Sequence, residues 1–219
     1  MALFGKKNVT KTNDGLSDTD RRLRDQFYNE PDSEIGGMLS PAIYAPQLYK
    51  QLAAYGHKEG WIADPEKYPL MYALLYNAYD TVQGVYWRFQ QRVNNDDSDH
   101  TGALKMSLGW CVYVAMADAY FCHEDWDSLR SAGMIYKLEN ACGFDNIDDF
   151  IEEKFGITNE DELRDHIMKL CEIAKKPWAE ASSLTKISQA KESMAAMFYY
   201  GIKLGMQYLG LLDKSEKMK

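Results

Sequence analysis

Cysteine is scarce in this chain, and the spacing that most often gives it a function is missing. The 219 residues include four cysteines, and no two of them form a Cys-x-x-Cys pair. Zinc ribbons and thioredoxin-type redox sites depend on that spacing, so both are excluded. We expect reduced and mostly buried thiols in a cytoplasmic compartment, at Cys111, Cys122, Cys142 and Cys171.

Positive charge is also in short supply. Lys and Arg number 25 against 33 Asp and Glu, so the formal net charge is −8. Nucleic-acid binding depends on cations that neutralise phosphates, and this balance disfavours it. The densest basic cluster consists of Arg21, Arg22 and Arg24, but aspartates are interleaved with it. We therefore expect no direct binding to nucleic acid.

The motifs of common enzyme classes are absent. The sequence has no G-x-S-x-G elbow, no P-loop and no dinucleotide-binding fingerprint. It also lacks the His-Glu-x-x-His motif of zinc proteases and the Glu-x-x-His motifs of di-iron bundles. Nothing in the sequence therefore predicts a cofactor, and an enzymatic role is not the favoured one.

Strand-like alternation is missing too, whereas helical periodicity runs through most of the chain. The pattern predicts an all-α protein, an irregular bundle of seven to eight helices with an N-terminal arm. We expect an arm at residues 1–45 with one short helix, followed by a single helical domain at residues 46–219. The helices expected in that domain cover residues 46–55, 69–93, 102–122, 124–141, 146–154, 159–176 and 184–212.

Two long apolar runs raise the question of a membrane span. The run from Met106 to Cys122 makes about 25 Å of helix, and a bilayer core needs about 30 Å. The run near the C-terminus is interrupted by Lys203. We therefore predict two central core helices and no membrane span. Gly201 and Gly205 lie one turn apart and predict the close approach of another helix.

Aromatic residues and methionine are abundant. The aromatic share is 13%, and there are 11 methionines. Both kinds of side chain are favoured in the cores of protein interfaces. Within the arm, Leu23 and Phe27 form an apolar edge, and Gly36 with Gly37 is a candidate hinge. The leading hypothesis is a non-enzymatic assembly subunit whose partners are protein chains. We expect a homo-oligomer or a larger complex, such as a virion-type particle made in the cytoplasm.

An alternative hypothesis is a Mg²⁺-dependent hydrolase acting on nucleotides or phosphoesters. If helices 69–93 and 102–122 form a hairpin, Asp118 lies beside Asn77, with Asp80 one turn away. Oxygen ligands of this kind suit Mg²⁺. The preferred interpretation is structural, with Asp118 hydrogen-bonded to Asn77 or to a tyrosine hydroxyl.

A second acidic pattern offers another version of the same alternative. Asp149-x-x-Glu152 and Glu162-x-x-Asp165 resemble the paired acidic motifs of all-α nucleotide pyrophosphatases, which hold Mg²⁺. Solvated surface charge is the preferred interpretation of these residues. A third hypothesis, an acidic inhibitor of a basic nucleic-acid-binding partner, follows from the net charge alone.

Overall fold

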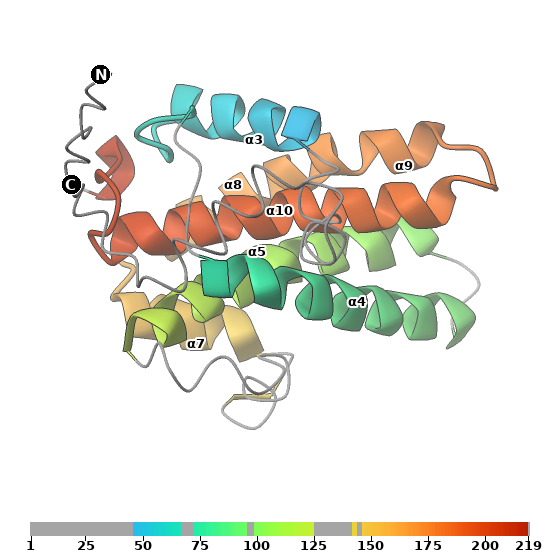
Figure 1. The fold of residues 1–219 in the computed structure, drawn as a ribbon, viewed down its shortest axis with the longest axis horizontal. Helices are drawn as coiled ribbons and strands as arrows, with labels where there is room; N and C mark the ends of the chain where they lie inside the picture. The colour runs from blue at the N-terminus through green and yellow to red at the C-terminus, as the bar shows by residue number, and fades with distance from the viewer. Residues whose placement is uncertain (1–45, 67–71, 96–98, 125–141, 144–145, 219) are drawn as a thin grey trace, which may run out of the picture.

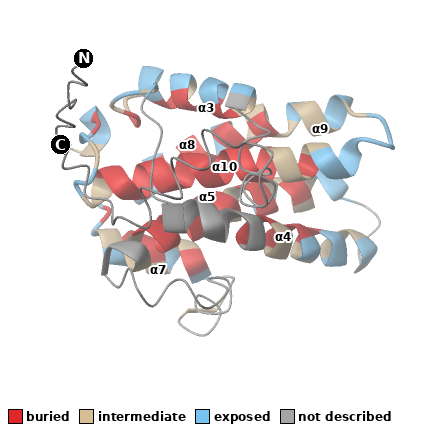
Figure 2. Ribbon diagram, viewed as in Figure 1, coloured by how far each residue is buried: buried red, intermediate tan, exposed pale blue. Residues whose placement is uncertain are grey.

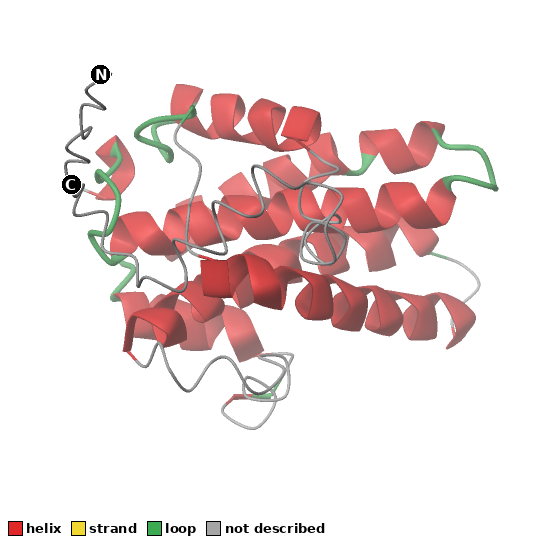
Figure 3. Ribbon diagram, viewed as in Figure 1, coloured by secondary structure: helices red, strands yellow, loops and turns green. Residues whose placement is uncertain are grey.

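The computed structural model describes residues 46–66, 72–95, 99–124, 142–143 and 146–218, and every regular element there is helical (Figures 1 and 3). The all-α prediction is confirmed for this part of the chain. Its elements, in order, are α3 (Pro46–Lys58), α4 (Tyr72–Asn95), α5 (His100–Glu124), α7 (Ile147–Phe155), α8 (Glu160–Ala174), α9 (Lys176–Glu180), α10 (Lys186–Tyr208) and the short 3₁₀ helix η3 (Glu216–Met218).

Helices α5 and α10 form the centre of the molecule. Every residue is buried from Cys111 to Ala119 in α5 and from Ser193 to Gln207 in α10 (Figure 2). A helix that is apolar on all sides is stable only when other elements enclose it, and here the outer helices do so. Across the described ranges, no helix combines the length and hydrophobicity that crossing a bilayer requires.

The two central helices approach each other closely because α10 has glycine at the contact. A Cβ atom on Gly201 would lie 2.3 Å from the Val112 carbonyl oxygen and 2.8 Å from the Ala115 Cβ. On Gly205 it would lie 2.9 Å from the Ala119 Cβ. Contacts advance in the same direction along both helices, so α5 and α10 run parallel. The close approach that the sequence predicted is confirmed.

The outer helices cover this pair from several sides. Helix α4 pairs with α5 as a hairpin, and the Arg92 guanidinium lies 4.2 Å from the centre of the Trp110 ring. Helix α3 packs on α10, where the Tyr49 and Tyr199 rings meet edge to face with their centroids 6.0 Å apart. Helices α7 and α8 pack on α5 (Figure 1).

Buried polar groups of α10 hold the segment that follows α3. The Lys203 ammonium donates to the carbonyl oxygen of Asp64. The Gln207 amide donates to the carbonyl of Trp61 at 2.9 Å and accepts from the N–H of Ala63 at 2.8 Å. Lys203 and Gln207, two polar side chains within an apolar run, therefore satisfy main-chain groups of the turn that follows α3.

Several helix boundaries differ from the prediction, among them those near Gly56, Cys122 and Pro177. Gly56 was expected to end α3, but the helix continues to Lys58, and the missing side chain makes room for Tyr200. Helix α5 extends through Cys122 to Glu124 instead of ending at Cys122. Pro177 was expected only to end α8. It lies instead in the first turn of α9, where proline needs no N–H partner.

Two predicted features lie outside the described residues. They are the arm, with Leu23, Phe27, Gly36 and Gly37, and most of the helix expected at 124–141. The predictions made for these residues stay untested.

The glycine contact can be tested with two matched substitutions. Gly201→Ala places a methyl group against the backbone of α5, so we expect a loss of about 1–3 kcal/mol in the free energy of unfolding. Gly109→Ala is the control, because its Cβ would meet Ile167 at 3.8 Å and Cys171 at 3.9 Å, ordinary contact distances. We expect Gly109→Ala to be neutral, or stabilising by up to about 1 kcal/mol. Urea unfolding followed by circular dichroism measures both variants. Equal losses would show that the close contact of α10 with α5 does not depend on glycine at 201.

Candidate functional site

A groove of about 420 Å³ lies between α5, α7 and α8. Its walls are mainly apolar, and polar side chains stand at its ends. Met106 and Met168 flank it and are 48% and 50% exposed. Residues of all three helices line it: Lys105, Met106, Gly109, Trp110, Tyr113, Ile147, Asp148, Arg164, Ile167 and Met168. A concave, largely apolar site with a few converging polar groups is the usual form of a binding site.

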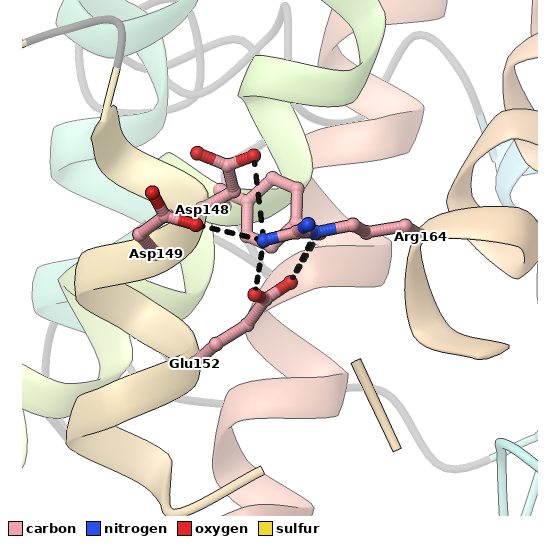
Figure 4. A network of polar contacts seen from close by, with 5 residues as sticks. Asp148, Asp149, Glu152 and Arg164 are labelled. Atoms are coloured by element: carbon pink, nitrogen blue, oxygen red, sulfur yellow. Dashed lines mark hydrogen bonds and ion pairs between the residues drawn. The ribbon is translucent and has the colours of Figure 1, made fainter. Parts of the chain in front are cut away.

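A polar network built around Arg164 closes one end of the groove (Figure 4). The guanidinium reaches from α8 to Glu152 of α7, with N–O distances of 3.0 and 2.6 Å. The Nη2 atom that makes the shorter contact also donates to Asp149 at 2.8 Å and lies 4.0 Å from Asp148. Such a two-pronged arginine–carboxylate pair fixes the spacing of α7 and α8.

The network extends to α5 through a tyrosine. The Tyr113 hydroxyl donates to the Glu152 carboxylate at 3.1 Å. Burial, and then the charge of Glu152, raises the pKa of Tyr113 far above its usual value, so this hydroxyl keeps its proton. The hydrogen bond to Glu152 likewise raises the pKa of Arg164. Glu152, which is only 3% exposed, is thus held by groups from two neighbouring helices.

The four acids that resemble a paired Mg²⁺ motif have different surroundings. Asp149 and Glu152 contact Arg164, whereas Glu162 pairs with Lys217 at 2.9 Å and Asp165 is exposed. No cluster of three or more His, Cys, Asp or Glu side chains able to hold a metal ion occurs in the described part of the chain. The preferred interpretation as surface charge holds for Asp149, Glu162 and Asp165, but it is wrong for Glu152, which is buried and ion-paired.

Asp118 is fully buried, and neither carboxylate oxygen has a hydrogen-bond partner among the residues that the structure describes. Burial raises the pKa of Asp118 well above its usual range, since the charged form is poorly solvated there. The side chains of Asn77 and Asp80 lie outside the described part, so their predicted placement beside Asp118 stays a prediction.

His166 is a second buried polar group, and the sequence analysis did not predict its role in packing. The ring of His166 stacks between Tyr55 and Trp61, with centroid distances of 5.7 and 5.2 Å. Its Nε2 atom lies 2.7 Å from the Tyr200 hydroxyl. Burial, with smaller effects from Lys169 and Lys217, lowers the pKa of His166 to about 3. The ring is therefore neutral near pH 7 and joins α3, α8 and α10.

The thiols of Cys111 and Cys171 are free and buried, as predicted. Burial raises both pKa values, to about 12 for Cys171, so neither thiol is a nucleophile near pH 7. The Cys122 side chain lies outside the described residues.

Comparison with known proteins adds no relative. The chain matches no protein-family model, and no curated protein or solved structure shows significant similarity to it.

The Arg164 network predicts a contrast between two ion pairs. Arg164→Met leaves buried Glu152 with Tyr113 as its only hydrogen-bond partner among the described residues. We therefore expect a loss of about 1–3 kcal/mol in the free energy of unfolding. This loss is smaller than the cost of breaking a fully buried ion pair. The Arg164 side chain is 41% exposed, and solvent weakens its interaction with Glu152. Lys217→Met is the matched control, since Lys217 and Glu162 are 40% and 60% exposed, and it should cost less than about 1 kcal/mol. Equal losses in chemical denaturation would show that the network does not hold α7 against α8.

Proposed function

We propose that this protein is a non-enzymatic helical subunit that works by assembling with other protein chains, as a homo-oligomer or within a larger complex. The proposal includes a bundle of seven to eight helices preceded by an arm at residues 1–45. The groove between α5, α7 and α8 is the observation that carries it. Its rim combines the half-exposed Met106 and Met168 with Trp110 and the partly exposed Arg164. Methionine, aromatic side chains and arginine are enriched in protein interfaces, and methionine adapts its shape to a partner.

The state of the reactive groups supports the same proposal. Glu152 is bound to Arg164, His166 is enclosed by aromatic rings, and the buried thiols hold their protons. Each of these groups serves the internal packing of the described helices. The groove, in contrast, has apolar surface that no described element covers, and a second protein would bury it favourably.

The native mass of the full chain tests this function. Light scattering during size-exclusion chromatography at micromolar concentration should give a multiple of the 25.1 kDa chain mass, or a complex with a co-purifying protein. A strictly monomeric chain without any co-purifying partner would contradict the proposal.

A Mg²⁺-dependent phosphoester hydrolase remains the second candidate, favoured by one observation. The Asp118 carboxyl is fully buried with no partner among the described residues, and carboxylate oxygens are the ligands that Mg²⁺ prefers. An assembly subunit needs no such ion. In an assembly subunit, the buried Asp118 carboxyl would only lower the free energy of unfolding.

Asp118→Asn separates the two candidates. Because burial raises the pKa of Asp118 in the folded state, its carboxyl lowers the free energy of unfolding at high pH. This loss is absent below the pKa of the unfolded state, about 4, and grows as pH rises toward the pKa of the folded state. For an assembly subunit, Asp118→Asn should raise the free energy of unfolding by about 1–3 kcal/mol at pH 7 and by less at pH 4. Millimolar Mg²⁺ should leave the melting temperature of the unmodified protein unchanged.

The exposed Asp161→Asn variant on α8 is the control and should change little at either pH. Thermal stabilisation by Mg²⁺ that disappears in Asp118→Asn would support the hydrolase and contradict the assembly role for this residue.

A further inference from the structure

The groove has a defined direction and length. Gly109 faces Ile167 and Cys171, and the carbonyl of Lys105 lies 3.5 Å from the Cys171 thiol. Near the other end, Tyr113 meets the Glu152–Arg164 pair. Helices α5 and α8 are therefore antiparallel, and the groove follows α5 from Lys105 to Tyr113. These eight steps along the helix cover about 12 Å, since each residue rises ~1.5 Å.

The two ends of the groove differ in charge. At the α7 end, three carboxylates surround the single guanidinium of Arg164, which leaves an excess of negative charge. Asp148 is the most weakly engaged of the three, 4.0 Å from Arg164 with its side chain 39% exposed. At the opposite end, Lys105 and Lys175 share the single carboxylate of Glu172, which leaves an excess of positive charge. A partner segment with acidic residues at one end and basic residues at the other would match the charges at the two ends of the groove.

The apolar floor sets a second requirement. A helix that lies in a groove inserts large side chains spaced three or four residues apart. Two such anchors one turn apart are separated by about 6 Å and fit within a groove about 12 Å long. Met106 and Met168, on opposite sides, can adjust to an aromatic and an aliphatic anchor.

A segment of this chain carries both features. Residues 17–29 belong to the 45 residues that precede α3 and lie outside the described structure. In that sequence, Leu23 and Phe27 are four residues apart, and Asp18 and Asp20 come first. The arginines at 21, 22 and 24 follow with Asp25 beside them, so residues 21–25 keep a net charge of +2. The acidic beginning suits the Lys105 end of the groove, and the arginines suit the end at Asp148.

We infer that residues 17–29 of a second copy of this chain bind in the groove between α5, α7 and α8, with Leu23 and Phe27 on its floor and Arg24 near Asp148. This inference rests on the proposed assembly function and names the partner that the groove receives. Each copy then donates one segment and offers one groove, which allows a closed dimer or a longer ring.

Native-mass measurements on the full chain test the two sides of the contact. The double variant Leu23→Ser/Phe27→Ser and the groove variant Met168→Arg should each shift the protein toward the monomer. Ile187→Arg on α10 is the matched control, because Ile187 is similarly exposed, at 55%, and does not line the groove. That variant should keep the mass of the unmodified protein. Assembly that survives both test variants would overturn the inference and leave the proposed function standing, whereas a monomeric unmodified protein would overturn both.

A charge exchange tests the predicted pairing at the α7 end. Arg24→Glu and Asp148→Arg should each weaken self-association by about tenfold, because each places like charges together. The two changes combined should restore it to within about threefold of the unmodified protein, since the pair is re-formed with opposite sign. Additive weakening in the double variant would overturn the contact between Arg24 and Asp148.

Photo-cross-linking identifies the occupant directly. A benzophenone side chain introduced at position 168 is irradiated in an equal mixture of light and heavy isotope-labelled chains. The expected product joins position 168 to a peptide from residues 17–29, and light–heavy pairs show that it links two copies. Products confined to single chains, or products with other segments, would overturn the inference.

Discussion

The close contact between α5 and α10 is the constraint on which the other contacts depend. With glycine at 201 and 205, the backbone of α10 lies against Val112, Ala115 and Ala119 of α5. Two parallel helices that are apolar on every side then share one dense core, and the remaining helices supply its cover. A wider separation would move the outer helices apart and open the apolar faces that α3, α4 and α8 now cover.

Several polar residues inside this core have specific partners. Lys203 and Gln207 hold the turn after α3, and that turn places Trp61 on the ring of His166. His166 in turn contacts Tyr200 on α10, so the polar and aromatic contacts form one connected set. Asp118 differs because its carboxyl has no hydrogen-bond partner among the described residues, and burial raises its pKa. A buried carboxyl without a partner lowers the free energy of unfolding, so Asp118 offers the sharpest local test of function.

Helix content and the central role of two helices follow from the sequence because apolar periodicity directly reflects burial. The apolar run Met106–Cys122 predicted a central core helix, and the described structure confirms it. The Gly201–Gly205 spacing predicted the close approach of another helix without saying which one, and that helix is α5. Boundaries were less predictable at Gly56 and Pro177, where tertiary packing and first-turn geometry outweigh the usual role of these residues as helix terminators.

The groove was hidden in the sequence because its walls come from three helices. Met106, Trp110 and Tyr113 do share one face of α5, which was the available signal. The pairing of Glu152 with Arg164 joins residues 12 positions apart on different helices. Sequence periodicity within one helix cannot reveal such a contact. Asp149 and Glu152, which looked like half of a possible metal motif, are in fact partners of Arg164.

We propose that the groove between α5, α7 and α8 is a binding surface that self-assembly covers. Hydrogen–deuterium exchange of the full chain, measured at concentrations below and above the one at which its mass increases, tests this claim most directly. We expect amides in 105–113 and 164–168 to become more protected in the assembled protein, while those of the central segment 193–207 stay unchanged. Assembly without any added protection in 105–113 and 164–168 would contradict it.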